Sequence, residues 1–392
     1  MRLPILTLSL LAAVNAFAID VSTPALPAAT QAFGVDIGQM QLTIGLYMFG
    51  YGVGQIPAGL MGDYFGRRIT VIIALLVFIL AGLVAATATT VELLLAMRFV
   101  QGLSGAAGVV MARAITRDIT TGAETGRLMG LMTATLGGVM IIAPLIGALL
   151  LATLGWRAPF MASSIFGIAA LVLLLTSIEE TLKLRPGDSL GSRFIEGITA
   201  FRDSPHGRIS ALLIGLAFCI LIAFVTLASE VFIQHFALNE MGYAAVFAIA
   251  SGGYMLGGLI CWRLVSRMPT LSLARGTVAA FCVVGIASIL LLPHSVSHPA
   301  MLTVIMILSF CCIGAMLSVA ATLALEALPH TAGMASGIMG TFQILLGACF
   351  SAALSLFQAD SLVMLHLTVG GCAAIMAVIV LATRHLTPST SR

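Results

Sequence analysis

Long apolar segments of about 20 residues alternate with short polar segments along almost the whole chain. Such a length matches one crossing of a hydrocarbon layer about 30 Å thick by an α-helix, which rises about 1.5 Å per residue. The pattern therefore predicts an all-α integral membrane protein with twelve spans, at residues 3–24, 39–60, 69–89, 92–113, 127–153, 158–178, 209–235, 243–262, 271–292, 299–325, 332–357 and 361–384.

The composition agrees with this pattern. Only 8% of the residues are charged and 60% are hydrophobic, whereas soluble proteins average about 25% charged and 45–50% apolar residues. A soluble fold is therefore excluded. The seven cysteines fall inside predicted spans at irregular spacing, which favours a packing role over a disulfide framework or a metal site. We expect no cofactor, no metal and no nucleic-acid partner.

The basic residues predict the topology, because Lys and Arg in short loops stay on the cytoplasmic side of a membrane. With the N-terminus inside, sixteen of the eighteen lie in cytoplasmic segments; the exceptions are Arg98, within a span, and Arg157, in an outer loop. We therefore expect both termini in the cytoplasm. Residues 1–18 also resemble a secretory signal peptide, but removing them would leave eleven spans and disturb the two-half arrangement described next.

The spans divide into two six-helix halves, at residues 1–178 and 209–392, joined by a polar cytoplasmic linker at 179–208. A weak internal repeat supports the division, because the sequence YMFG at 47–50 recurs as YMLG at 254–257. Parallel repeats of six helices place a substrate site between the halves near the middle of the membrane.

The linker itself has a helical pattern. Phe194, Ile198 and Phe201 recur at helical spacing among charged residues, which predicts a short helix on the inner membrane surface. A disordered tether is the alternative interpretation.

The loop after the second span reads GLMGDYFGRR at residues 59–68. It resembles the G-x-L-x-D-x-x-G-R-[KR] signature of the major facilitator superfamily. The resemblance implies a network of charged residues at this loop that holds the outward-facing state closed on the cytoplasmic side, as a latch. The alternative is a basic loop that only anchors the topology. The resemblance implies that the latch residues are Gly59, Asp63, Gly66, Arg67, Arg68 and, at the inner end of the fourth span, Asp118.

The fourth span carries the sequence RFVQGLSG from Arg98, which is similar to a second signature of the same superfamily, R-x-x-Q-G-x-G. Gly102 and Gly105 share a helix face with Arg98, so they permit close approach of another helix, which we expect to be the first span.

Asp20 and Arg98 are the two clear charges inside predicted spans, where an ionised side chain costs about 2.5–3.5 kcal/mol. At about 1.5 Å per residue, Asp20 lies about 25 Å from the inner end of the first span, and Arg98 about 9 Å from the outer end of the fourth. These levels agree to within about a helical turn, so the two residues can meet. We expect them to couple protons to transport; a static buried salt bridge is the alternative.

Residues 19–27 and 113–118 resemble the Bcr/CflA branch of the superfamily, the drug:proton antiporters that confer bicyclomycin and chloramphenicol resistance. The resemblance implies a monomeric carrier in the bacterial inner membrane that exports small drug-like molecules in exchange for protons, by alternating access. In the fifth span, Pro144 and Gly147 preserve the helix bend, although three glycines of the antiporter pattern are replaced.

Polar residues of the spans are candidates for the substrate cavity. Along the second span, Tyr47, Tyr51 and Gln55 recur every fourth residue, a spacing that simple helix packing explains equally well. Glu230, near the outer end of the seventh span, is also typical of a solvated carboxylate at a helix end. The absence of catalytic motifs argues against a membrane enzyme. The glycine-rich loops and the doubled six-helix layout favour a rocking carrier over a channel with a fixed filter. A carrier of the same fold for a metabolite, sugar or siderophore stays open. The cavity candidates are Tyr47, Tyr51, Gln55, Gln101 and Glu230.

Overall fold

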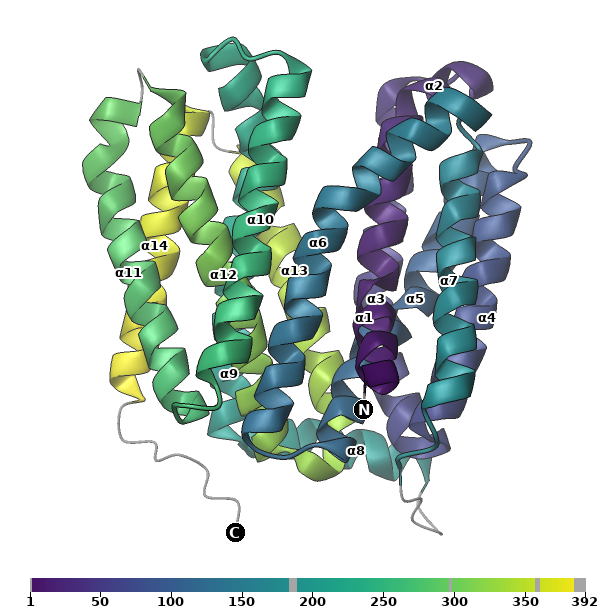
Figure 1. The fold of residues 1–392 in the computed structure, drawn as a ribbon, viewed down its shortest axis with the longest axis vertical. Coiled ribbons are helices and arrows are strands. Elements are labelled where there is room, and N and C mark those ends of the chain that lie inside the picture. The colour runs from purple at the N-terminus through teal and green to yellow at the C-terminus, as the bar shows by residue number, and fades with distance from the viewer. Residues whose placement is uncertain (1, 183–188, 296–297, 357–359, 384–392) are drawn as a thin grey trace. The chain divides into compact units, whose positions relative to one another are not determined.

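The computed structural model describes residues 2–182, 189–295, 298–356 and 360–383, and all regular elements in these ranges are helices (Figure 1). The first long helices are α1 (Arg2–Ser22), α3 (Ile37–Phe65), α4 (Arg67–Ala86), α5 (Val91–Ile119), α6 (Ala123–Leu154) and α7 (Ala158–Ser177). The others are α9 (Pro205–Glu230), α10 (Glu240–Leu264), α11 (Thr270–Ser295), α12 (Pro299–Ala327), α13 (Ala332–Leu356) and α14 (Ser361–Ala382). Short elements are η1 (Thr23–Ala25), α2 (Leu26–Phe33), α8 (Leu190–Asp203), η2 (Val231–His235) and η3 (Pro329–Thr331).

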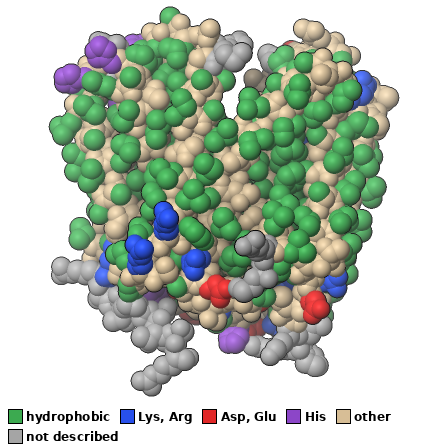
Figure 2. Space-filling model, viewed as in Figure 1, with side chains coloured by type: hydrophobic (Ala, Val, Ile, Leu, Met, Phe, Trp, Pro, Cys, Tyr) green, Lys and Arg blue, Asp and Glu red, His purple; other side chains and the backbone are tan. Residues whose placement is uncertain are grey.

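Each predicted span corresponds to one long helix. Within the described residues, eleven helical segments are long and apolar enough to cross a membrane, and one of them runs from α1 through α2. The twelfth long helix, α3, is not among these segments; it has 29 residues and carries glutamines, tyrosines and Asp63. Figure 2 shows apolar side chains over most of the visible face, with most of its charged side chains toward the lower end, as a membrane environment requires.

The chain forms two compact units. Unit 1 comprises Met1–Thr120, Gly138–Asp203 and Leu328–Thr341, and unit 2 comprises Thr121–Gly137, Ser204–Ala327 and Phe342–Arg392. Two helices, α6 and α13, are therefore divided between the units. The first turns of α13 belong to unit 1, and the first turns of α6 belong to unit 2.

Glycines let α3 and α5 cross in backbone contact within unit 1. A Cβ atom on Gly102 would overlap the carbonyl group of Tyr47, and one on Gly50 would overlap the carbonyl group of Phe99. Close contact between helix backbones is a common way to pack helices in lipid, where the hydrophobic effect does not drive helices together.

The same pair of contacts occurs within unit 2, between α10 and α12. A Cβ atom on Gly314 would overlap the carbonyl group of Tyr254, and one on Gly257 would overlap that of Cys311. The short sequence repeat thus marks the same helix crossing in both units, with the tyrosine carbonyl and the glycine in the same roles.

Two short helical elements, η1 and α2, follow α1. The helix ends at Ser22 because Pro24 supplies no backbone N–H, and the chain continues through η1 into α2. Phe33 of α2 contacts the edge of Trp156, with ring centroids 5.1 Å apart. Arg157 stacks on Trp156 at 4.3 Å and donates a hydrogen bond to the carbonyl group of Ala88, so this arginine, expected in an outer loop, has a local structural role.

The linker contains the predicted helix, α8. Its Phe201 is buried and its Gly197 packs on Met334, whereas Phe194 and Ile198 are exposed. A disordered tether is therefore wrong for residues 190–203. The position of α8 on a membrane surface stays a prediction.

We expect Gly50→Ala to destabilise the protein by roughly 1–3 kcal/mol, because the new methyl group forces α3 away from α5. Gly45→Ala on the same helix is the matched control: no atom lies within 4 Å of the added Cβ. Thermal unfolding in detergent, followed by size-exclusion chromatography, measures the difference. Equal unfolding midpoints for the two variants would contradict the packing at Gly50.

Candidate functional site

Arg98 lies completely buried in unit 1. Its Nη1 donates to Gln101 Oε1 at 2.9 Å and to the carbonyl oxygen of Ala18 at 3.4 Å, while its Nη2 donates to Ser22 Oγ at 3.2 Å. Arg98 and Gln101 are three residues apart on α5 and therefore share a face, which explains why the motif pairs an arginine with a glutamine. The guanidinium group joins α5 to the last turns of α1.

Aromatic rings complete the surroundings of the guanidinium group. It lies 4.2 Å from the ring centre of Tyr47 and 5.6 Å from that of Phe160. A desolvated cation over an aromatic face gains about 2 kcal/mol. The Tyr47 hydroxyl group donates to Asn15 Oδ1 at 2.6 Å, which holds the ring of α3 against α1.

A chain of hydrogen bonds continues from Arg98 into α7. Gln101 Nε2 donates to Ser163 Oγ at 2.9 Å, and Ser163 Oγ donates to the carbonyl oxygen of Phe160 at 2.6 Å. The buried polar groups of α1, α5 and α7 are thereby joined, as burial in a low-dielectric interior requires.

Asp20 is half-buried and forms no hydrogen bond or ion pair with any residue that the structure describes. Arg98 reaches the same level of α1, because its contacts Ala18 and Ser22 bracket Asp20. However, residues two positions away point about 160–200° from Asp20 around the helix. The predicted meeting of Asp20 and Arg98 is therefore not a direct contact: the arginine occupies the opposite side of α1. Tyr47 is within electrostatic reach of both charges.

The helix that carries the predicted bend, α6, packs against Val21, the residue after Asp20. Pro144 lies inside α6, and a Cβ atom on Gly147 would overlap the carbonyl group of Val21. Phe17, Val21 and Ala143 form a small apolar cluster there. The close approach explains the glycine, and the bend itself stays a prediction.

The polar candidates of α3 have different surroundings. Tyr51 is half-buried, whereas Gln55 is only 1% exposed. Gln55 lies against α13, where a Cβ atom on Gly340 would overlap its side-chain amide and one on Gly337 its backbone carbonyl. Tyr47, Gln55 and Gln101 thus pack between helices of unit 1, and contact of any of them with a substrate stays a prediction.

Glu230 lies at the exposed end of α9 in unit 2 and accepts a hydrogen bond from Ser361 Oγ at 2.8 Å. Ser361 is the first residue of α14. This position agrees with a solvated carboxylate at a helix end, and a role in the substrate cavity stays a prediction.

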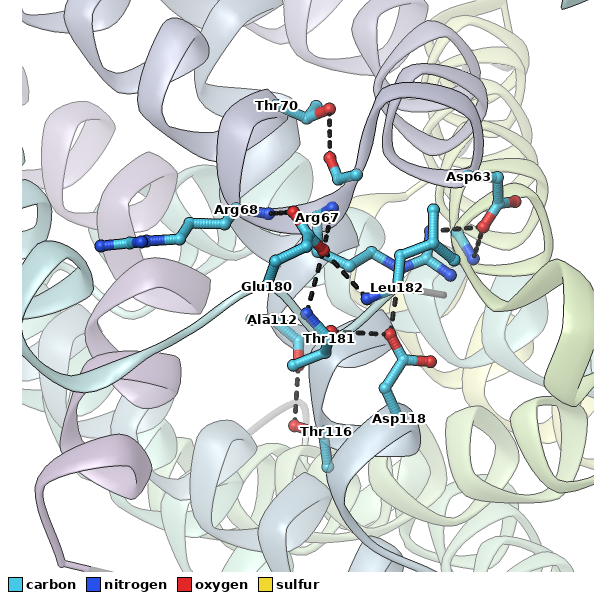
Figure 3. A network of polar contacts seen from close by, with 12 residues as sticks. Asp63, Arg67, Arg68, Thr70, Ala112, Thr116, Asp118, Glu180, Thr181 and Leu182 are labelled. Atoms are coloured by element: carbon cyan, nitrogen blue, oxygen red, sulfur yellow. Dashed lines mark hydrogen bonds and ion pairs between the residues drawn. The ribbon is translucent and has the colours of Figure 1, made fainter. Parts of the chain in front are cut away.

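The loop after α3 forms a second polar cluster, which joins α3, α4, α5 and the segment after α7 (Figure 3). Asp63 accepts hydrogen bonds from the backbone N–H groups of Gly333 at 3.2 Å and Met334 at 2.7 Å, in the first turn of α13. It also accepts one from Arg67 Nη1. A carboxylate at a helix N-terminus interacts favourably with the helix dipole. Asp63 therefore binds the start of α13 to the end of α3.

Arg67 is held between two carboxylates. Its side chain is almost completely buried, and its Nε donates to Asp118 Oδ2 at 3.1 Å. The sequence prediction that Asp63, Arg67 and Asp118 belong together matches this geometry. Arg68 lies apart from this group and donates to the carbonyl oxygen of Leu175 at 3.0 Å.

The two glycines of the motif are each required by a different feature of the structure. A Cβ atom on Gly59 would overlap the carbonyl group of Gly333, so Gly59 allows α3 and α13 to approach. Gly66, between α3 and α4, has a φ of 112°, which side-chain-bearing residues rarely adopt.

Sequence reasoning missed two further members of the cluster, both directly after α7. Thr181 Oγ1 donates to Asp118 Oδ2 at 2.9 Å, and Glu180 accepts from the first two backbone N–H groups of α4. Neither residue belongs to a motif, and the amides of α13 have no sequence signature. We define the latch as Asp63, Arg67, Asp118 and the first turn of α13.

The chain is similar to known proteins over most of its length. A sequence model of the Major Facilitator Superfamily matches residues 8–352. The uncharacterized MFS-type transporter YdgK of Bacillus subtilis (strain 168) is 28% identical over 299 residues, covering 75% of this chain and 73% of the relative. The bicyclomycin resistance protein homolog of Haemophilus influenzae is 26% identical over 400 residues, covering 97% and 96%. The multidrug resistance protein MdtL of Shigella flexneri serotype 5b is 27% identical over 205 residues, covering 50% and 49%.

Two solved structures share the fold. The human organic anion transporter MFSD10 has a TM-score of 0.76 at 16% identity, covering 97% of this chain and 98% of that protein. The proton:xylose symporter XylE has a TM-score of 0.72 at 16% identity, covering 97% and 95%. At this identity the similarity shows the fold alone. It confirms the predicted class, an all-α membrane protein with twelve spanning helices.

We expect Arg98→Lys to lower the free energy of unfolding by at least about 2 kcal/mol, because an ammonium group cannot bind Gln101 and Ser22 while covering the Tyr47 ring. Arg202→Lys is the control, since Arg202 is exposed on α8 and bound to the neighbouring Asp203. Thermal unfolding of the purified variants measures the difference. An Arg98→Lys protein as stable as the Arg202→Lys protein would contradict this assignment.

Proposed function

Because the chain belongs to the major facilitator superfamily, we propose that it is a proton-coupled secondary transporter that exports small drug-like molecules from the cytoplasm by alternating access. Membership confirms the resemblance of the two motifs and makes the chain a multi-pass membrane transporter of small molecules, not an enzyme. One observation carries the finer proposal: Asp20 is a carboxyl group inside a membrane-spanning helix and has no ion pair with any residue that the structure describes.

The contacts of Arg98 bear on the role of Asp20. The arginine is bound to Gln101 and Ser22 and covered by Tyr47, so its charge is stabilised without a carboxylate. An acid inside a membrane-spanning helix is expensive to keep ionised and marks ion pathways by default. Asp20 is therefore positioned to gain and lose a proton as its access to water changes.

Exchange follows if the two access states favour different protonation of Asp20. In the proposed cycle, a proton from the outer side binds Asp20 as the cargo is released outward, and loss of this proton toward the cytoplasm resets the carrier. The halves at 1–178 and 209–392, joined by the linker at 179–208, rock against each other. The latch closes the cytoplasmic side, where both termini lie.

The relatives support the cargo class. Proteins from Haemophilus influenzae and Shigella flexneri that are similar to this chain carry names that refer to bicyclomycin and multidrug resistance. We accordingly propose a monomeric exporter of drug-like molecules in a bacterial inner membrane.

Transport assays in everted membrane vesicles test the coupling acid. Addition of a transported drug should dissipate an imposed pH gradient, and Asp20→Asn should abolish this response because the amide cannot carry a proton. Asp36→Asn is the matched control: Asp36 is an exposed N-cap of α3, and asparagine caps helices equally well. A full response from inserted Asp20→Asn protein would eliminate Asp20 as the coupling group.

Resistance profiling tests the cargo. Cells that overexpress the protein should tolerate higher concentrations of one or more antibiotics than cells that express Asp20→Asn, because the variant cannot use the proton gradient to drive export. Protection against no antibiotic class, with proton exchange intact, would instead favour a metabolite, sugar or siderophore as the cargo.

A further inference from the structure

We propose that Glu180 is a positioning residue of the latch, and that the linker between the halves is thereby a working part of the cytoplasmic gate. This inference rests on the proposed alternating-access function. The latch residues of α3, α4 and α5 were expected from sequence motifs, whereas Glu180 lies in the segment after α7, outside any motif.

One carboxylate gathers four backbone amides. Glu180 Oε1 accepts hydrogen bonds from the N–H groups of Arg67, Thr181 and Leu182, each at 2.9 Å, and Oε2 accepts one from Arg68 at 3.0 Å. Two of these amides begin α4 and two begin the linker. The negative charge also lies at the N-terminus of α4, where the helix dipole favours it. Glu180 thus fastens the start of the linker to the start of α4.

This attachment fixes Arg67 at both ends. Glu180 holds the backbone of Arg67, and Asp63 and Asp118 hold its guanidinium group (Figure 3). Thr181 closes a ring of contacts, because its hydroxyl group binds the same oxygen of Asp118 that accepts from Arg67 Nε. A shift of the linker start would therefore move the arginine on which the latch depends.

The glycine between α3 and α4 is explained by the same contact. A Cβ atom on Gly66 would overlap the carboxylate of Glu180, and the φ of 112° also disfavours any larger residue. The absence of a side chain at Gly66 leaves the space that the Glu180 carboxylate occupies.

The linker touches the latch a second time through α8. A Cβ atom on Gly197 would overlap the side chain of Met334, and the backbone N–H of Met334 is the one that Asp63 binds at 2.7 Å. The segments before and after residues 183–188 thus both contact the latch. Movement of the first turn of α13 away from Asp63 would therefore also disturb its packing on α8. Loss of the Glu180 carboxylate would leave the backbone N–H of Arg67 without its acceptor.

Labelling of a single cysteine tests this role. In a protein whose seven native cysteines are replaced, Ser336→Cys places a thiol on α13, at a completely buried position beside Gly337, which contacts Gln55 of α3. A membrane-impermeant maleimide applied to everted vesicles reaches this thiol only when the cytoplasmic side opens. Glu180→Ala should increase the labelling rate about five- to tenfold, because the first backbone N–H groups of α4 and of the linker lose their shared acceptor. Glu180→Gln, which keeps one acceptor oxygen, should give an intermediate rate.

Two controls separate the possible outcomes. Glu179→Gln, at the exposed neighbouring acid, should leave the rate unchanged, and Asp63→Asn should increase it by breaking the latch directly. If Asp63→Asn accelerates labelling and Glu180→Ala does not, the role of Glu180 is wrong and the latch stands. If neither accelerates it, the latch itself, and with it the proposed cycle, is wrong.

A third control detects general unfolding. A variant that retains only Cys372, a buried residue of α14 in unit 2, should label at the same slow rate with or without Glu180→Ala. Faster labelling of Cys372 would mean that the substitution destabilises the whole protein, which would overturn the proposed positioning role.

Discussion

A guanidinium group buried in a membrane-spanning helix needs its charge stabilised locally, since neither water nor lipid can do so. At Arg98, Nη1 and Nη2 donate to an amide oxygen, a backbone carbonyl and a hydroxyl group, and the guanidinium group lies on the face of Tyr47. Nε has no hydrogen-bond partner among the described residues. No carboxylate is among the described contacts of the guanidinium group. As a consequence Asp20, on the other side of α1, has no ion pair with any of the described residues. A direct ion pair would have stabilised both charges and made protonation of the acid more costly. The proposed coupling therefore depends on how Arg98 is bound.

The second unit shows what the same helix crossing looks like without a charge. On α5, Arg98 is the residue before Phe99, whose carbonyl group contacts Gly50 of α3. On α12, Phe310 is the residue before Cys311, whose carbonyl group contacts Gly257 of α10 in the same way. Phe310 is completely buried and makes edge contacts with Phe224 and Phe247. An apolar ring thus fills the position that the arginine holds in unit 1. The helix packing is repeated, but the buried arginine belongs to one repeat, in the unit that also contains Asp20, the acid of the proposed proton coupling.

Length and depth were predictable from the sequence because both follow from the rise per residue. The twelve long helices and the shared level of Asp20 and Arg98 are of this kind. Rotation about a helix axis is different, since each residue turns the side chain by about 100° and the contacted face depends on packing with other helices. The opposite placement of Asp20 and Arg98 around α1 was missed for this reason. The contact of Asp63 with Met334, 271 residues away, was missed because a backbone N–H is common to nearly all residues.

The latch region derives its strength from several modest interactions. Asp63 binds the start of α13 and Glu180 the start of α4, and a charge at a helix N-terminus contributes about 0.3–1 kcal/mol, or about 2 when partly buried. Two such contacts together shift an equilibrium by roughly one to three powers of ten at most, because 1.4 kcal/mol corresponds to a factor of ten. Reversing a two-state population from 1:99 to 99:1 requires about 5.5 kcal/mol. These contacts are thus strong enough to bias the proposed gate toward one state and weak enough for cargo and proton binding to reverse it.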